Sequence, residues 1–412
     1  MSPLPFAASR PFFGWHVVAA TFLLAIFGWG VGFYGPPVFL YAVVERTGWP
    51  VALVSAAVTV HFLVGAFVVA NLPRLYRRLG VPQVTVLGAV LLALGVMGWA
   101  LAAAPWQLFA AAPVSGAGWV GMGAAAVNAL VAPWFSLRRP AALGMAYNGA
   151  SLGGVLFSPL WITLIAGIGF AAAALAVGGA MLAVIVLLAV LVFSRTPEGM
   201  GQHPDGAGAP VAPPAVRVPS GRLSLWRDRR FLTLAAGMML GLFAQIGLLA
   251  HLFSLLVPVL GEGGAGLAMG GATLAAILGR SLVGWAMPAS TDRRLVACMS
   301  YGVQVLGSLI FLAAAGTGGG WLILGLALFG LGIGNATSLP PLIAQQEFAP
   351  KDAARVVPLI VAIGQAGYAF APAAFGLLRG GAGGEAALFA CAAAVQLAAI
   401  GCFLAGRGTR TA

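Results

Sequence analysis

The sequence contains few charged residues. Only 7% of its 412 residues are Asp, Glu, Lys or Arg, whereas 61% are hydrophobic, and the mean hydropathy is +1.01. The nine Asp and Glu residues all fall in predicted loops or at predicted helix ends. This composition excludes an ordinary water-soluble domain and indicates an integral membrane protein.

Other absences exclude whole classes of site. The three cysteines, Cys298, Cys391 and Cys402, are isolated and lack the spacing of a metal site or a disulfide scaffold. The chain has no nucleophile elbow, no zinc-protease motif and no pair of aspartates within its apolar runs. We therefore expect no catalytic residue, no metal and no cofactor, and we do not expect an enzyme. The net charge of +12 is spread over short loops without an aromatic platform, so nucleic acid is not an expected partner.

Long apolar runs are abundant instead. Crossing about 30 Å of hydrocarbon takes roughly 20 apolar residues in a helix. We expect an all-α membrane protein with twelve transmembrane helices, at about 14–42, 50–72, 82–103, 107–134, 139–165, 168–193, 231–258, 265–288, 295–316, 320–346, 353–378 and 385–405.

The basic residues predict the orientation of these helices. Of the 21 Lys and Arg residues, 18 lie in the N-terminus, the C-terminus or every second connection. The exceptions are Arg46, Arg280 and Arg379. Because cytoplasmic loops carry the excess of positive charge, we expect both termini in the cytoplasm and the chain in the plasma (inner) membrane.

The chain divides into two similar parts. A polar, Pro-rich connector over 194–230 separates predicted six-helix bundles at 1–193 and 231–412. Residues 114–154 and 328–369 resemble each other, with spaced glycines, a basic turn and a helix of small residues. Two such bundles around a site at the bilayer midplane are typical of secondary transporters. The proline pairs Pro36–Pro37 and Pro340–Pro341 predict helix breaks at related places in the two bundles, or else passive kinks.

One charged residue lies inside a predicted helix. Arg280 precedes Asp292 by twelve residues, which at about 1.5 Å per residue places it roughly 18 Å deep. An arginine at that depth costs at least about 2.5 kcal/mol. No predicted helix supplies a carboxylate, so water, backbone carbonyls, polar side chains or a transient anion must solvate it. We favour an anion over a purely structural role.

Three segments carry a resemblance to a known family. They are "FFGWHVVAATF" (12–22), "WFSLRRPAALGMAYNGASLGG" (134–154) and "LGRSLVGW" (278–285). With them the chain resembles the major facilitator superfamily, and within it the monocarboxylate transporter family and its bacterial relatives. The resemblance implies a major facilitator fold and proton-coupled transport of small monocarboxylates such as lactate or pyruvate, with Arg280 binding the carboxylate.

The family's loop motif, G-x-L-x-D-R-x-G, is altered here. It reads "NLPRLYRRLG" (71–80) in the first part, with Arg77 in place of the acid, and its counterpart "MPASTDRRLV" (287–296) is also degenerate. Ala276 stands where animal members often carry an acid, and the first helix lacks their lysine. Proton coupling through those groups is therefore not expected here.

Further polar residues complete the predicted site. We expect substrate contacts from Tyr34, Asn128, Tyr147, Asn148, Asn335, Gln365 and Tyr368, and proton coupling through His61 or His251. Each of these residues could instead fasten one helix to the next. An anion exchanger of the oxalate/formate type, an exporter of hydrophobic compounds and a non-transporting sensor stay open as alternatives. The expected partners are a small organic anion, protons and the lipid bilayer, and we treat the protein as a monomer.

Overall fold

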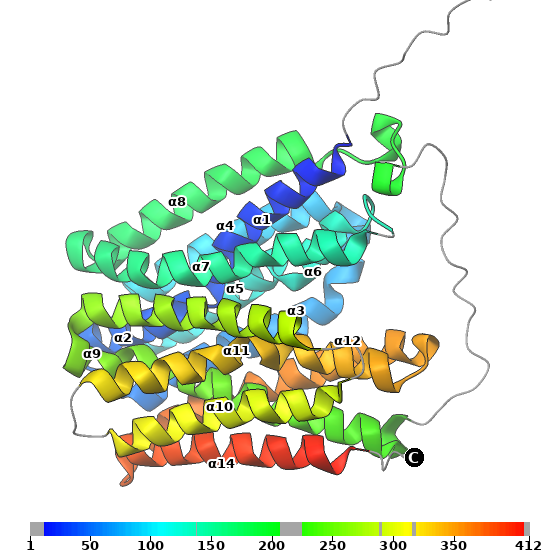
Figure 1. The fold of residues 1–412 in the computed structure, drawn as a ribbon. Helices are drawn as coiled ribbons and strands as arrows, with labels where there is room; N and C mark the ends of the chain where they lie inside the picture. The colour runs from blue at the N-terminus through cyan, green and yellow to red at the C-terminus, as the bar shows by residue number, and fades with distance from the viewer. Residues whose placement is uncertain (1–11, 137, 207–224, 288–290, 315–318, 408–412) are drawn as a thin grey trace, which may run out of the picture.

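The computed structural model describes residues 12–136, 138–206, 225–287, 291–314 and 319–407, and within them it contains helices and no strand. Figure 1 shows most of the helices of residues 14–193 on one side of the bundle and those of residues 229–405 on the other, and we call these two parts the first and second halves. The helices are α1 (Gly14–Gly32), α2 (Gly35–Thr47), α3 (Val51–Leu79), α4 (Val81–Leu101), α5 (Pro105–Met122), α6 (Ala124–Val131), α7 (Arg139–Ile168), α8 (Phe170–Leu188), α9 (Arg229–Ala286), α10 (Arg293–Ala313), α11 (Gly319–Glu347), α12 (Pro350–Tyr368), α13 (Ala371–Gly380) and α14 (Gly384–Ala405).

The number of membrane-spanning helices agrees with the sequence. Eleven helical stretches of the described chain are long and apolar enough to cross a membrane, and one of them, α9, has 58 residues. A straight helix of that length would measure about 87 Å, far more than a bilayer. It is broken at Gly261, whose φ of 68° is left-handed, and the chain reverses direction there (Figure 1). Two spans within α9 bring the total to the predicted twelve.

Several spans are interrupted within the bundle. The first is divided at Phe33 and Tyr34, and Pro36 and Pro37 then occupy the first turn of α2. The break predicted from that proline pair is therefore confirmed. The break predicted at Pro340 and Pro341 is wrong, because α11 continues through both residues to Glu347.

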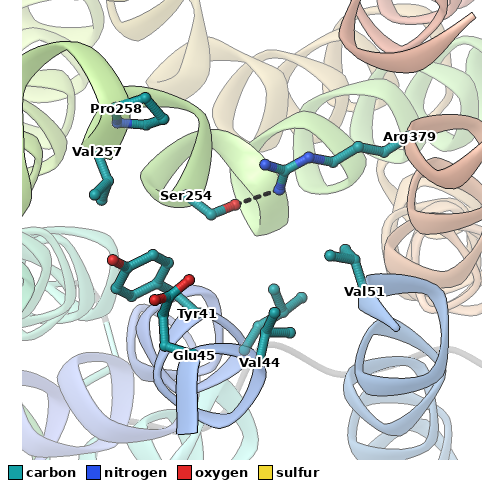
Figure 2. Close-up of a pocket in the computed structure, with 9 residues that line it drawn as sticks. Tyr41, Val44, Glu45, Val51, Ser254, Val257, Pro258 and Arg379 are labelled. Carbon is teal, nitrogen blue, oxygen red and sulfur yellow. Dashed lines mark hydrogen bonds between the residues drawn. The ribbon is translucent and has the colours of Figure 1, made fainter. Parts of the chain in front are cut away.

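The first described residues of α1 and the last of α14 lie at one end of the bundle, which we call the terminal end (Figure 1). The two halves contact each other closely toward the other, or opposite, end. There the Tyr41 hydroxyl donates to Glu262 Oε1 at 3.2 Å, and the Tyr41 ring meets Phe253 edge to face at 5.2 Å. The Ala373 backbone N–H donates to Thr59 Oγ1 at 3.0 Å. A cavity of about 320 Å³ lies between the halves at this end, and Figure 2 shows residues that line it.

A short part of the connector folds back onto the first half at the terminal end. The Asp205 carboxylate accepts the backbone N–H groups of Ser136 and Arg138, both at 3.1 Å, just before α7. Gln202 Oε1 accepts the Phe13 N–H at 3.0 Å, and the Asp205 N–H donates to Trp134 O at 2.9 Å. The rest of the predicted connector, 207–224, lies outside the described residues.

Candidate functional site

Arg280 is held by a close contact between α9 and α11. A Cβ on Gly279 would lie 2.0 Å from Leu331 O, and a Cβ on Gly334 would lie 2.3 Å from Ala276 O, so only glycine permits this approach. Through it, the Gly334 carbonyl accepts the Nε–H of partly buried Arg280 at 3.2 Å. Among the described residues no carboxylate pairs with Arg280, and its two terminal NH₂ groups have no hydrogen-bond partner.

Tyr34, which belongs to the first half, lies close to this arginine. It stands at the break between α1 and α2, and its ring packs over Gly154 of α7. A Cβ on Gly154 would lie 2.6 Å from the Tyr34 ring and 2.7 Å from the Thr273 methyl group. The Tyr34 hydroxyl reaches the Thr273 side chain and lies within electrostatic range of Arg280. One aromatic hydroxyl from the first half and one cation from the second therefore share this site.

A second group of predicted residues lies in the first half. Asn128 donates its amide to the Tyr147 hydroxyl at 2.6 Å, and Trp29 meets the Tyr147 ring edge to face at 6.0 Å. Trp29 also contacts Trp119 at 5.0 Å. Asn128 and the neighbouring Asn148 are both exposed. Trp29, Trp119 and Tyr147 therefore form an aromatic cluster, and Asn128 is hydrogen-bonded to it.

The remaining predicted contacts come from the second half. Buried Asn335 directly follows Gly334 and donates weakly to Gly279 O at 3.5 Å, while its Oδ1 has no partner among the described residues. Gln365 and Tyr368 lie one helical turn apart on α12, with their side chains close to each other. The Tyr368 ring meets Phe62 of the first half at 5.8 Å. Asn335 thus belongs to the Arg280 group, whereas Tyr368 lies between the halves.

The two histidines lie in separate places. His61 is 1% exposed, with Nε2 3.0 Å from Gly32 O and Nδ1 2.8 Å from Ser115 Oγ. Because a carbonyl only accepts, His61 Nε2 carries a proton. His251 places Nε2 3.0 Å from Pro372 O, and its buried Nδ1 has no partner in the described chain. The described partners of His61 all lie in the first half and those of His251 in the second.

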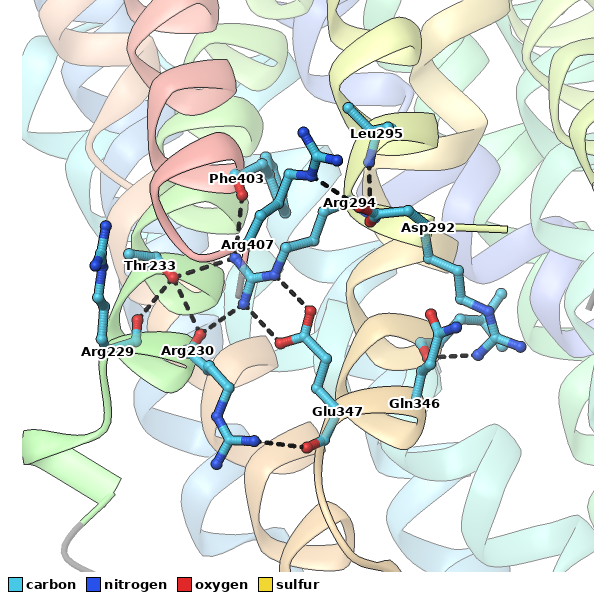
Figure 3. A network of polar contacts seen from close by, with 12 residues as sticks. Arg229, Arg230, Thr233, Asp292, Arg294, Leu295, Gln346, Glu347, Phe403 and Arg407 are labelled. Atoms are coloured by element: carbon cyan, nitrogen blue, oxygen red, sulfur yellow. Dashed lines mark hydrogen bonds and ion pairs between the residues drawn. The ribbon is translucent and has the colours of Figure 1, made fainter. Parts of the chain in front are cut away.

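Arg294 provides a contrast to Arg280. Only 1% of its side chain is exposed, and it forms a bidentate ion pair with Glu347 at 2.6 and 2.8 Å (Figure 3). Its other N–H groups donate to Thr233 Oγ1, Phe403 O and Arg230 O. A buried arginine that only fastens helices is satisfied in this way. Sequence reasoning missed this network because it placed Arg294 and Glu347 at helix ends, where solvent is expected.

The comparison with known proteins assigns the family. The model of the Major Facilitator Superfamily matches residues 18–372, which is most of the chain. The chain belongs to the major facilitator superfamily. It is therefore a multi-pass membrane transporter for small substrates and not an enzyme, and the predicted fold class is confirmed.

A curated relative supports a narrower similarity. The chain is 27% identical to monocarboxylate transporter 11 of Mus musculus over 245 residues, which cover 58% of this chain and 51% of that protein. The match thus spans about half the length of this relative.

Solved structures share the fold over nearly the full length of the chain. The nucleoside transporter NupG matches with a TM-score of 0.72 at 14% identity, over 96% of this chain and 98% of that chain. A bacterial homologue of the human lysosomal transporter Spinster, inward-facing and unoccupied, matches with a TM-score of 0.68 at 16% identity, over 98% and 100%. At these identities the similarity shows the fold alone.

Proposed function

We propose that the protein is a secondary active transporter of small organic monocarboxylates, with Arg280 as the group that pairs with the substrate carboxylate. One observation carries the proposal. Arg280 is fixed through Nε by a backbone carbonyl, whereas both terminal NH₂ groups lack a partner in the described chain. These two groups form the planar fork that a carboxylate binds in bidentate fashion.

The neighbouring residues favour a small anion with an apolar tail. Tyr34 places a hydroxyl near Arg280 and offers its ring to a short carbon chain. Asn335, one residue from Gly334, has an Oδ1 without a partner among the described residues, and this atom can accept a hydrogen bond from a substrate hydroxyl. Lactate combines a carboxylate with such a hydroxyl, and the similarity to a monocarboxylate transporter supports the same class.

In this proposal the bundles at 1–193 and 231–412 rock about the site between them. The contacts of Tyr41 with Glu262 and of Thr59 with Ala373 close the opposite end. These contacts support a state in which the site would open toward the terminal end. The positive-inside rule places that end in the cytoplasm, so we assign an inward-facing state in the plasma (inner) membrane.

Proton coupling is assigned to His61 in this proposal. Its Nε2 bonds to Gly32, next to the α1–α2 break that carries Tyr34, so a change of charge on His61 acts on that break. A His61→Gln variant keeps a donor but does not titrate. It should retain exchange of labelled for unlabelled lactate and lose stimulation by a proton gradient. His251→Gln serves as the matched comparison, and loss of stimulation in that variant alone would assign the proton to His251.

The decisive experiment is transport by the purified protein in liposomes. We expect saturable uptake of labelled lactate or pyruvate, stimulated by an inward proton gradient and lost in Arg280→Gln. Arg46→Gln is a suitable control because Arg46 donates to Trp99 O, away from Arg280. Uptake that requires preloaded anion would indicate an exchanger. Full uptake by a well-folded Arg280→Gln protein would disprove the role of Arg280.

A further inference from the structure

The cavity at the opposite end contains a second arginine. Its walls come from both halves: α2 contributes Tyr41 and Glu45, α9 contributes Ser254 and Pro258, and α13 contributes Arg379. Figure 2 shows Arg379 and Ser254 on one side and Tyr41 and Glu45 on the other. At about 320 Å³ the cavity is at the small end of the range for ligand sites.

Arg379 is fixed in place but only partly satisfied. One N–H donates to the Ser254 hydroxyl, which itself donates to His251 O at 2.8 Å. The ion pair with Glu385 is loose at 3.9 Å, and Glu385 is 51% exposed. The other N–H groups of Arg379 have no hydrogen-bond partner among the described residues. The Arg379 side chain is 17% exposed. Its guanidinium therefore has N–H donors available to bind an anion.

The helix α2 extends from the Arg280 site to this cavity. Along α2, Tyr34 and Glu45 are eleven residues apart, or roughly 16 Å in a helix. Near the start of α2 the halves enclose a small apolar hollow, which we call the apolar constriction, lined by Phe33, Pro37, Val58, Phe62, Leu249 and Ala250. An anion at Arg379 would thus be separated from Arg280 by a short hydrophobic barrier.

We propose that Arg379 forms a second carboxylate site at the opposite end, which holds the transported anion outside the apolar constriction. This inference rests on the proposed function. Glu45 on the facing wall repels a second negative charge, so the site favours monocarboxylates over dicarboxylates. The apolar side chains of Val44 and Val51 accommodate the carbon tail of the substrate.

A reporter cysteine in the cavity tests the site separately from Arg280. In a chain whose native cysteines are replaced by serine, Val51→Cys is labelled with a membrane-impermeant thiol reagent, with and without lactate. An added Arg280→Gln substitution removes the central site. Lactate should still slow labelling in that background, by about tenfold when it is present at about ten times its Kd. Arg379→Gln should abolish the protection, whereas the matched variant Glu385→Gln should keep it.

The two proposals fail in different ways. If the Val51→Cys protein with Arg280 intact transports lactate but lactate does not slow labelling in the Arg280→Gln background, the Arg379 site is wrong and the proposed function stands. If the wild-type protein transports no monocarboxylate, the proposed function fails first. Should Arg379→Gln not fold, Arg379→Lys keeps the charge without the fork and is expected to weaken protection. Glu45→Gln provides an independent test. Succinate should slow labelling of the Val51→Cys reporter in the Glu45→Gln variant but not in the protein that keeps Glu45.

Discussion

Arg294 and Glu347 form a bidentate ion pair that joins the start of α10 to the end of α11, with Nε 2.6 Å from Oε1 and Nη2 2.8 Å from Oε2. The same guanidinium binds carbonyls at the start of α9 and the end of α14. Four elements of the second half thus meet on one side chain (Figure 3).

Removal of Glu347 should destabilise the second half. Glu347→Gln leaves the guanidinium of Arg294 buried without a counter-charge, which costs about 3 kcal/mol or more. We expect a clear fall in the thermal unfolding temperature of the detergent-solubilised protein. Arg407→Gln breaks an exposed pair with Asp292 and should cost only about 0–1 kcal/mol. Equal shifts for the two variants would contradict the role of the buried pair.

The second prediction concerns pH. Burial opposes ionisation of Asp292, but Arg407 and the N–H groups of Arg294 and Leu295 outweigh it and hold the pKa of this carboxyl below its ordinary value. The ionised form therefore adds stability above about pH 4, the unfolded value, and this stability is lost as pH falls through the lower folded value.

Asp292→Asn isolates this effect, because asparagine caps a helix as well as aspartate but does not titrate. Unfolding temperatures measured from pH 3 to pH 7 should converge for wild type and variant at the acid end and separate in favour of wild type above it. Parallel profiles would show that the charge of Asp292 contributes nothing.

Gly154 should control the position of Tyr34. In Gly154→Ala the new methyl group would lie 2.6 Å from the Tyr34 ring, so the ring must shift from its present position. Overpacking of this kind costs about 1–3 kcal/mol, and we expect kcat/KM for lactate to fall roughly tenfold. Gly144→Ala, on the same helix and with open space at its Cβ, is the control. Similar transport by both variants would separate Tyr34 from substrate binding.

Asp205 should hold the start of α7. Its carboxylate accepts two backbone N–H groups there, so Asp205→Ala should cost about 1 kcal/mol, as the loss of a helix cap does. Hydrogen exchange should accelerate in the first turn of α7 and stay unchanged in α10. Glu198→Ala, in the same part of the connector, provides the comparison. Unchanged exchange near Arg139 would mean that this contact is not maintained in solution.

The sequence predicts most of the fold because a bilayer demands long apolar runs, and these can be counted. Twelve spans and the break before Pro36 follow from that demand and from the chemistry of proline. The continuous helix through Pro340 and Pro341 does not follow from them, because within a helical bundle the neighbouring helices can hold a proline-containing segment in helical form. The reversal at Gly261 falls within 259–264, the connection expected between the predicted helices 231–258 and 265–288, although the sequence did not show that a single residue makes the turn.

The candidate site could be predicted only in part, for a similar reason. Charge and depth identify Arg280, since both are properties of one position in the chain. The meeting of Tyr34, Gly154 and Thr273 depends on three separate helices, which no local pattern reports. Arg294 and Glu347 are far apart in sequence, and only packing of their helix ends buries one against the other.

Gly261 also determines how movement passes through the second half. It is the one residue with non-helical dihedral angles between Arg229 and Ala286, a stretch that the structure describes in full. Ser254 and Arg280 therefore lie on the two arms of a helical hairpin whose turn is a single residue. We therefore expect that a displacement of the arm that carries Ser254, which binds Arg379, reaches the arm that carries Arg280 through rotation about this single glycine.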